Sequence, residues 1–371
     1  MSDGETGEPG QSAAFDDRLD RLRSRMSEGS LDGLVTSHPP NVRYLSGFTG
    51  SSGVLAVLPD RAVLVTDFRY EEQAGAELSP PFELEIARDG SFGLLGKLLG
   101  TEAADLRLGF EAEHLSVRDH ERLREEAPGP EWTATYDLVE VLRARKDSAE
   151  LALLERAADV ACRALARTLE AVEAGVTELE MTAELEHRLR SEGSEGPAFE
   201  TIVAAGPRSA LPHARPSIRP LAEGDLLLMD FGAVTGGYRS DITRTFVLGP
   251  AAPWQEEIHA AVLAAREAAL EAARPGVEAR DVDAAARDSL EAAGFGERFG
   301  HATGHGIGLE VHEGPGLSRR SDAILQEAHV VTIEPGVYLP GRGGVRVEDD
   351  VVMHAGGARL LTDFPTDLRE L

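Results

Sequence analysis

Two stretches in the second half of the chain share one pattern at a constant offset. In residues 169–193 and again in residues 270–294, a Leu-Glu-Ala run leads to Gly-Val and then to an amphipathic helix that closes on glycine. Similar sequence at a fixed period indicates repeated structural units. We therefore expect the second domain to contain two related halves, each with two helices followed by strands. Coincidence between alanine-rich helices is the alternative.

The chain changes character at Asp147. Asp147 and Glu150 have the form of a capping box that opens a helix. Apolar residues then recur every three or four positions, which predicts a long helix with one face on a core. They are Leu151, Leu154, Ala158, Ala161, Leu165, Leu169 and Val172. The 371 residues suit two domains, and we expect a disordered tail over 1–12, an N-terminal domain over 13–145 and a second domain over 146–371.

The expected N-terminal domain alternates short apolar runs with helical stretches, which predicts an α/β fold. Strands are expected at 31–36, 54–58, 62–66, 82–87 and 106–110, and helices at 67–77, 91–100 and 116–126. One more strand and a short helix should lead to Lys146.

The charge and cysteine content exclude several classes of partner and site. The formal net charge of -28 argues against binding to nucleic acid or anionic membrane, since both require basic surface. The surplus of acids also suggests a salt-adapted source. No run of eighteen apolar residues and no apolar signal core occur, so we expect a cytoplasmic protein. A single cysteine, Cys162, excludes an internal disulfide and a thiolate metal cluster.

Three histidines, His301, His305 and His312, stand within twelve residues. Imidazole is the commonest transition-metal ligand and titrates near neutral pH, so the cluster indicates a metal site, proton transfer or both. Gly304 and Gly306 flank His305, which argues against a helical zinc site. The segment predicts a tight loop entering an extended stretch, with its backbone close to another group.

Four acids accompany apolar strand patterns and supply further candidate ligands. Asp230 and Asp241 lie near the ends of an expected hairpin, Glu334 ends an apolar run, and Glu348 lies within another. Buried unpaired acids are costly, so these acids either meet cations or lie at the surface. With His305 they form an oxygen-rich set suited to Mn(II), Co(II), Fe(II) or Zn(II), and several carboxylates can bridge two ions.

Six motifs in order make the chain, from about residue 13 to residue 371, similar to a known family. The sequence resembles the pita-bread-fold metallopeptidases, and within them the Xaa-Pro aminopeptidase and Xaa-Pro dipeptidase (prolidase) group. The motifs are Leu211-Pro212-His213, Asp230-Phe231-Gly232, Ser240 to Thr245, His301 to Glu313, Glu334-Pro335-Gly336 and Gly344 to Asp349.

The resemblance implies a fold: a pita-bread (creatinase/aminopeptidase-like) α+β catalytic domain with a pseudo-two-fold repeat, preceded by a smaller creatinase-N-terminal-like α/β domain. It also implies a metal ligand set. Asp230 would bind one ion, His305 and Glu334 the other, and Asp241 and Glu348 would bridge the two. Glu334 would also shuttle the proton of the bridging water.

The resemblance gives the remaining site residues supporting roles. His213 and His312 would lie near the scissile carbonyl and the proline, and His301 would steady the site. Arg346 would support a ligand from behind or contact the substrate. Three of the four have an ordinary alternative: His213 as a solvated loop residue, and His312 and Arg346 as members of exposed ion pairs with neighbouring acids.

The implied activity is hydrolysis of the bond between an N-terminal residue and proline by a hydroxide that bridges two divalent ions. Mn²⁺ is expected first, with Co²⁺, Zn²⁺ or Fe²⁺ as alternatives, and a homodimer is expected. The alternatives are a methionine aminopeptidase and a non-catalytic pita-bread binding protein. A metal-independent creatinase-like protein is disfavoured because the ligand set is complete. The sequence does not distinguish dipeptidase activity from aminopeptidase activity.

Overall fold

The structure is a computed structural model that describes residues 9–371. The chain divides into two compact units, with the boundary in the sequence between Arg143 and Ala144, and each unit is described by itself. Of the tail expected over 1–12, residues 1–8 lie outside the described part. Residues 9–12 belong instead to the first helix, which opens with Pro9, a residue whose fixed φ suits a helix start.

The N-terminal unit is built on one mixed six-stranded sheet of order β4-β3-β2-β1-β5-β6. Strands β1, β2 and β3 pair antiparallel, whereas β4, β5 and β6 each join the sheet in parallel. The strands are β1 (Gly33–Thr36), β2 (Gly53–Val57), β3 (Ala62–Asp67), β4 (Phe82–Ala87), β5 (Arg107–Glu111) and β6 (Glu131–Thr135).

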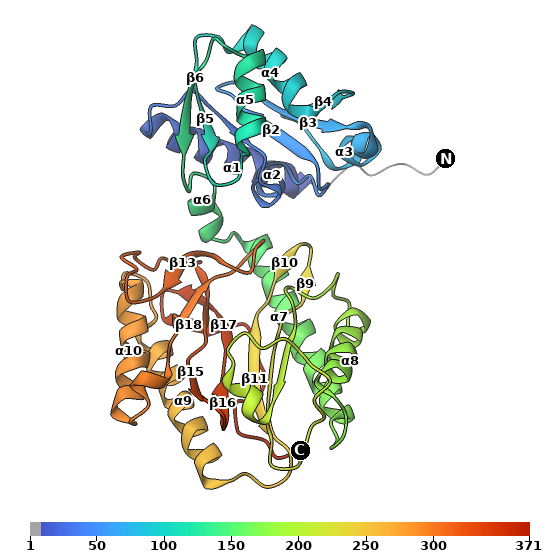
Figure 1. Cartoon of the computed structure of the whole chain (residues 1–371). Coiled ribbons are helices and arrows are strands. Elements are labelled where there is room, and N and C mark those ends of the chain that lie inside the picture. The colour runs from blue at the N-terminus through green and yellow to red at the C-terminus, as the bar shows by residue number, and fades with distance from the viewer. Residues whose placement is uncertain (1–8) are drawn as a thin grey trace. The chain divides into compact units, whose positions relative to one another are not determined.

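Helices cover both faces of this sheet, with α4 and α5 on one face and α1 and α2 on the other (Figure 1). Consecutive residues such as Val54 and Leu55 are both fully buried, as expected for a sheet with two covered faces. The helices are α1 (Pro9–Glu28), α2 (Pro39–Ser46), η1 (Phe68–Tyr70), α3 (Glu71–Glu77), α4 (Ser91–Glu102), α5 (Val117–Glu126) and, at the boundary, α6 (Glu140–Ala144).

The second unit begins with two helices and a three-stranded sheet of order β11-β8-β7. The capping box expected at Asp147 and Glu150 is formed, and the helix that it opens runs to Thr168. The elements are α7 (Ser148–Thr168), η2 (Leu169–Ala171), α8 (Glu178–Ser191), β7 (Ile202–Ala205), η3 (Gly206–Ala210), β8 (Leu226–Phe231), β9 (Val234–Thr235), β10 (Tyr238–Arg239) and β11 (Ile242–Val247).

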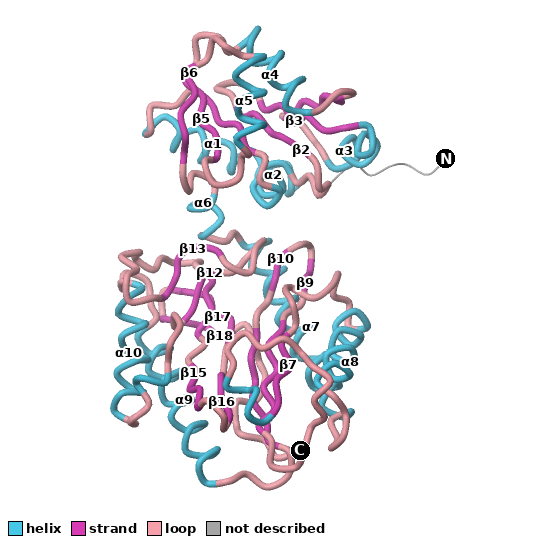
Figure 2. Tube along the Cα trace, viewed as in Figure 1, coloured by secondary structure: helices cyan, strands magenta, loops and turns pink. Residues whose placement is uncertain are grey.

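The second half of this unit again has two helices, followed by a five-stranded sheet of order β13-β12-β14-β17-β18 and the hairpin β15-β16. In Figure 2 the strands lie between the helix pairs of the two halves. The elements are α9 (Pro253–Ala272), α10 (Ala279–Ala292), η4 (Gly296–Arg298), β12 (Gly304–Gly306), β13 (Glu313–Leu317), β14 (Val330–Ile333), β15 (Gly336–Leu339), β16 (Gly343–Arg346), β17 (Asp349–His354) and β18 (Gly357–Leu360).

The two halves repeat each other in hydrogen bonding as well as in sequence. The N–H of Gly175 donates to Leu221 at 2.9 Å, and the N–H of Gly276 donates to Leu325 at 2.8 Å. Both glycines have left-handed φ values, +98° and +90°, which glycine adopts without steric cost. The expected pseudo-two-fold repeat is therefore present.

Each half buries its own apolar core. One core joins α7 and α8 to β7, β8 and β11, and the other joins α9 and α10 to β14, β16 and β17. Within residues 9–371, no helix has the length and apolar character needed to span a bilayer.

Candidate active site

The hairpin of β8 and β11 carries the first two candidate ligands. Asp230 lies within β8, opposite Thr243 of β11, and Asp241 immediately precedes β11. Both residues are buried, with exposed fractions of 8% and 4%. The alternative that these two acids lie at the protein surface is therefore excluded.

His305 is the central residue of β12, between Gly304 and Gly306. The glycines do not form the tight loop expected from the sequence, because the chain is extended there and pairs with β13 and β14. A Cβ atom at Gly304 would lie 1.9 Å from the Thr332 carbonyl oxygen, and one at Gly306 would lie 2.3 Å from that of Gly314. Close approach of neighbouring backbones requires glycine here, which confirms the expectation that the backbone lies close to another group.

Glu334 and Glu348 flank strands, whereas the sequence placed Glu348 inside one. Glu334 follows β14, and Pro335, which lacks an N–H, ends that strand. Glu348 lies between β16 and β17. The Glu348 N–H donates to Thr243 on β11 at 3.1 Å, so this residue crosses to the other sheet at that point.

The candidate ligands meet around the His305 ring. His305 Nε2 lies 3.7 Å from Asp241 Oδ2 and 3.6 Å from Glu334 Oε1. One ligand atom from each of Asp241, His305 and Glu348 lies within 4.8 Å of the others. Asp230 adjoins this group closely enough to raise the pKa values of Glu334 and Glu348. The structure thus brings together all five residues proposed from sequence.

Hydrogen bonding leaves His305 Nε2 as a lone-pair donor. Nδ1 lies 3.0 Å from the Gly306 carbonyl oxygen, which can only accept, so Nδ1 carries the proton. Burial lowers the pKa of His305 to about 4, so the ring is neutral at neutral pH. Its Nε2 lone pair consequently faces carboxylate oxygens, an arrangement that attracts a cation.

The carboxylates also behave as a set that requires positive charge. Burial, followed by repulsion from neighbouring carboxylates, raises the pKa values of Asp241 and Glu348 well above their usual range. Burial likewise raises the pKa of Glu334 to about 7, although Arg346 opposes this shift. Asp230 Oδ1 and Asp241 Oδ1 are buried without hydrogen-bond partners. Four carboxylates and one imidazole lone pair therefore fit divalent cations.

Arg346 lies behind the carboxylates rather than at an exposed ion pair, as its exposed fraction of 3% shows. It contacts Asp230 directly and donates to Thr243 Oγ1 at 3.0 Å. It also donates to the Tyr338 hydroxyl at 2.8 Å, and that hydroxyl lies 2.8 Å from His301 Nε2. A continuous chain of hydrogen bonds therefore joins Asp230 to His301.

His301 is held in one protonation state by this chain. Its Nδ1 donates to the Ala302 carbonyl at 2.8 Å, so Nε2 accepts from Tyr338. Burial and the nearby Arg346 lower the pKa of His301 to about 4. Nδ1 also lies 3.8 Å from Glu334 Oε2, so the neutral ring borders a candidate ligand.

Three supporting residues were not assigned roles from the sequence. Tyr338 joins His301 to Arg346. Thr243 donates to Glu348 Oε2 at 2.5 Å, and Asp350 accepts from the Asp241 N–H at 2.9 Å. A signal was present for Asp350, since an acidic run at 348–350 between apolar strands is costly to bury without partners. Tyr338 carries no such signal, because its position depends on the β15-β16 hairpin.

A pocket of about 360 Å³ opens onto the ligand group. His213 and His312 are exposed residues in its lining, and the His312 ring meets the His305 ring edge-on at 4.4 Å. Apolar side chains form another part of the wall, namely Phe199, Ile202 and Val311. All the site residues expected from sequence line this pocket.

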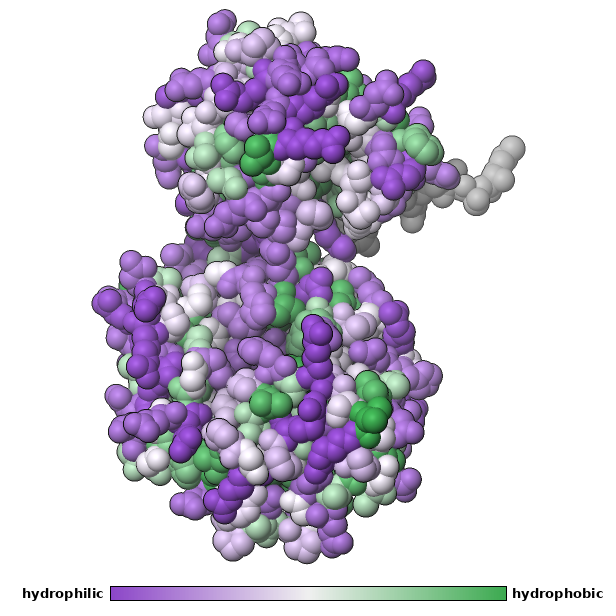
Figure 3. Space-filling view, viewed as in Figure 1, coloured by the Kyte–Doolittle hydropathy of each residue, from purple (hydrophilic) through white to green (hydrophobic). Residues whose placement is uncertain are grey.

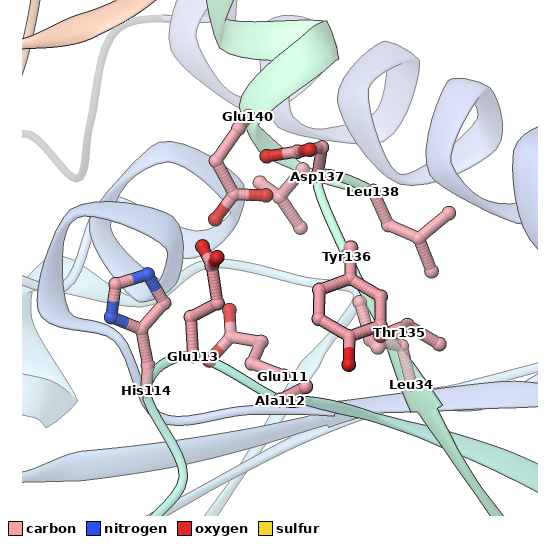
Figure 4. A pocket seen from close by; sticks show the side chains of 11 residues that line it. Leu34, Glu111, Ala112, Glu113, His114, Thr135, Tyr136, Asp137, Leu138 and Glu140 are labelled. Carbon is pink, nitrogen blue, oxygen red and sulfur yellow. The ribbon is translucent and has the colours of Figure 1, made fainter.

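A hollow in the N-terminal unit also gathers acids, including Glu111, Glu113 and Glu140 (Figure 4). Its volume is only about 10 Å³, which is too small for a peptide. Glu111 already accepts from Asn41 at 2.7 Å and from the Ser37 N–H at 3.0 Å. Glu140 also accepts from Asn41, so two of the three acids have partners within the domain, and the hollow is not a peptide site.

Comparisons with known proteins bear on both units. The family model described as metallopeptidase family M24 matches residues 152–355, and that of the creatinase/prolidase N-terminal domain matches residues 18–145. The Xaa-Pro dipeptidase of Pyrococcus furiosus is 37% identical over 354 residues, which cover 95% of this chain and 99% of that protein.

Two solved structures are similar over nearly their whole length. The Xaa-Pro dipeptidase from Bacillus anthracis has a TM-score of 0.93 and 39% identity, covering 96% of this chain and 100% of the other. The X-Pro aminopeptidase from Thermotoga maritima has a TM-score of 0.87 and 37% identity, covering 95% and 99%.

Proposed function

Because the chain belongs to metallopeptidase family M24, we propose that it hydrolyses the peptide bond between an N-terminal residue and a following proline. The observation that carries the proposal is the convergence of four carboxylates, three of them on buried residues, and the His305 lone pair in one pocket. The names of its relatives, Xaa-Pro dipeptidase and X-Pro aminopeptidase, support the choice of proline.

We assign two divalent ions to five residues, and we expect these ions to be Mn²⁺. Asp230 would hold one ion, His305 and Glu334 the other, and Asp241 and Glu348 both. When bound, such ions lower the pKa of a shared water and polarise the scissile carbonyl.

Glu334 is the proposed proton carrier. Hydrolysis requires a group that takes a proton from the attacking water and returns it to the proline nitrogen. Burial disfavours the charged form of Glu334, which suits a residue that alternates between two protonation states. His301, held neutral beside it, would keep the carboxylate in place without protonating it.

His213 and His312 are proposed to act on the substrate side. Both are exposed at the pocket, so their ring N–H groups can reach a bound carbonyl oxygen. A donor to the developing oxyanion typically contributes about 3 kcal/mol to transition-state stabilisation. Phe199, Ile202 and Val311 offer apolar surface to the substrate, whose proline nitrogen has no N–H for recognition.

The test is an assay of the purified protein with Mn²⁺ against Leu-Pro, Leu-Pro-Gly, Leu-Ala and Met-Ala-Ser, with the released N-terminal amino acid measured by chromatography. Release from Leu-Pro alone would identify a dipeptidase, and release from both proline peptides an aminopeptidase. Cleavage of Met-Ala-Ser in preference to either would indicate the methionine aminopeptidase alternative. Absence of all cleavage, with Mn²⁺ binding shown by calorimetry, would overturn the peptidase proposal in favour of a binding protein.

We also propose a homodimer, which light scattering coupled to size-exclusion chromatography measures directly. Location in the cytoplasm stays a prediction from the sequence, and fractionation of the source cells tests it.

A further inference from the structure

Lys146 forms a buried ion pair in the second unit. Its Nζ lies 2.9 Å from Glu313 Oε2, and the two side chains are 1% and 6% exposed. Lysine is rare in this chain, and the only other one, Lys97, is exposed on α4. Because two charges lose their hydration when buried, such a pair is not explained by stability alone.

Glu313 lies at a position from which it can organise the proposed active site. It directly follows His312, begins β13 and pairs with Gly306, the neighbour of His305. Its Oε1 accepts from the Glu310 N–H at 3.1 Å. The Glu313 carboxylate is therefore enclosed by the loop 307–312 that it terminates.

Gly308 shows how closely that loop wraps the carboxylate. A Cβ atom at this position would lie 2.7 Å from both Glu313 carboxylate oxygens. On the other side of the loop, Arg239 donates from its backbone N–H to Gly308 at 2.9 Å and from Nε to Leu309 at 3.1 Å. The loop is thus fixed at 308–310 and again at 313, and His312 lies between the fixed points.

Lys146 is itself held firmly. Its N–H donates to the Ala328 carbonyl at 2.9 Å, and Arg145 bridges to His329. These contacts attach the residue to the start of β14, the strand that leads to Glu334. The ammonium group therefore reaches Glu313 from a fixed point on the sheet.

We propose that Lys146 is a positioning residue that sets the place of His312 through Glu313. The part of this proposal that concerns turnover by His312 rests on the proposed peptidase function. The ordering of the loop by Lys146 does not depend on that function. Lys146 touches none of the five candidate ligands and is not in the pocket lining, so its effect passes through the loop.

Hydrogen exchange measured by mass spectrometry tests the structural part without any activity. Lys146→Met should speed amide exchange in peptides covering 307–313 in the metal-free protein, whereas Lys97→Met should leave them unchanged. The double variant Lys146→Met/Glu313→Gln also replaces the carboxylate that loses its lysine partner with a neutral amide, so a folding defect in the single variant does not prevent the measurement. Unchanged exchange in the single variant, or in the double variant if the single one does not fold, would overturn the proposal.

Kinetics test the connection to His312. Lys146→Met should lower kcat for Leu-Pro about tenfold or more, because small displacements of an oriented group cost rate steeply. In a His312→Ala background the same substitution should have little further effect, and Mn²⁺ affinity should be unchanged in both. If Lys146→Met lowers kcat by the same factor in the His312→Ala background as in the unaltered protein, the positioning role is overturned. A loss of Mn²⁺ affinity in Lys146→Met would also overturn it. If the unaltered protein cleaves no Xaa-Pro peptide, the proposed function fails, while the exchange experiment still decides whether Lys146 orders the loop.

Discussion

At the scale of single residues, one hydrogen bond fixes the chemistry of His305. Donation from Nδ1 to Gly306 leaves Nε2 with its lone pair among carboxylates. A ring that donated from Nε2 would instead form an ion pair or hydrogen bond with Asp241 and would not be a ligand. The same logic makes His301, which has both nitrogens engaged, a supporting residue.

The proposed roles of Glu334 and His312 predict different failures. Glu334→Ala should abolish turnover and weaken Mn²⁺ binding, because it removes a candidate ligand together with the proton carrier. His312→Ala should mainly lower kcat, by up to about a hundredfold, since it removes one donor and no ligand. Calorimetry with Mn²⁺ and steady-state kinetics separate the two, and equal loss of metal in both variants would contradict the assignment.

His259, on α9 and away from the site, should make stability depend on pH. Burial lowers its pKa to about 4, against about 6.5 in the unfolded chain. Between these values the unfolded chain binds a proton that the folded protein does not. The contribution is therefore complete above pH 6.5 and is lost as the pH falls toward 4.

Urea unfolding at pH 7 and pH 5 measures this effect. His259→Leu should reduce the decrease in unfolding free energy between these pH values by about 2 kcal/mol relative to the unaltered protein. An identical decrease in both proteins would show that His259 does not carry this pH dependence.

At the scale of elements, strand ends carry the site, and a second arginine connects them. Arg244 on β11 donates to the Glu348 carbonyl at 2.6 Å and to Asp349 Oδ1 at 2.7 Å. It also donates to the carbonyls of Phe364 at 2.8 Å and Pro365 at 3.0 Å. One guanidinium thus joins β11, the start of β17 and the C-terminal segment.

Removal of this guanidinium should affect both stability and the site. Arg244→Met should lower the unfolding free energy by about 3–5 kcal/mol, because buried acceptors lose their partner. It should also weaken Mn²⁺ binding, since Glu348 loses its backbone anchor. Arg163→Met, which removes exposed ion pairs on α7, is the control and should cost less than about 1 kcal/mol. Equal effects would contradict the connecting role of Arg244.

In the N-terminal unit, the secondary structure agrees with the sequence-based prediction where the apolar periodicity is strong. All six expected strands and the helices at 91–100 and 116–126 have counterparts within a few residues, and the helix expected at 67–77 is present as η1 followed by α3. Helix α2 was not anticipated, because Pro39-Pro40 resembles a loop although proline suits the first turn of a helix. Local patterns therefore predicted elements better than they predicted where helices begin.

At the scale of the whole molecule, the charge of -28 should make stability depend on salt. Hydrophilic side chains cover most of the face shown in Figure 3. At a net charge of -28, exposed acids repel one another through water. Salt screens this repulsion, with a Debye length of about 30 Å at 0.01 M and about 3 Å at 1 M. Urea midpoints should therefore rise from 0.01 M to 1 M KCl. A midpoint that does not rise would contradict the salt-adapted interpretation.

The sequence alone determined most strands and several helices, the repeat of the second unit and the residues of ligand type. Periodicity and residue chemistry are local properties, so they can be read without coordinates. The sequence could not show that Glu348 crosses to β11, that Tyr338 joins Arg346 to His301, or that Lys146 reaches Glu313. These contacts join residues far apart in the chain, and only packing of the two sheets, with the burial that it imposes, decided which polar groups meet.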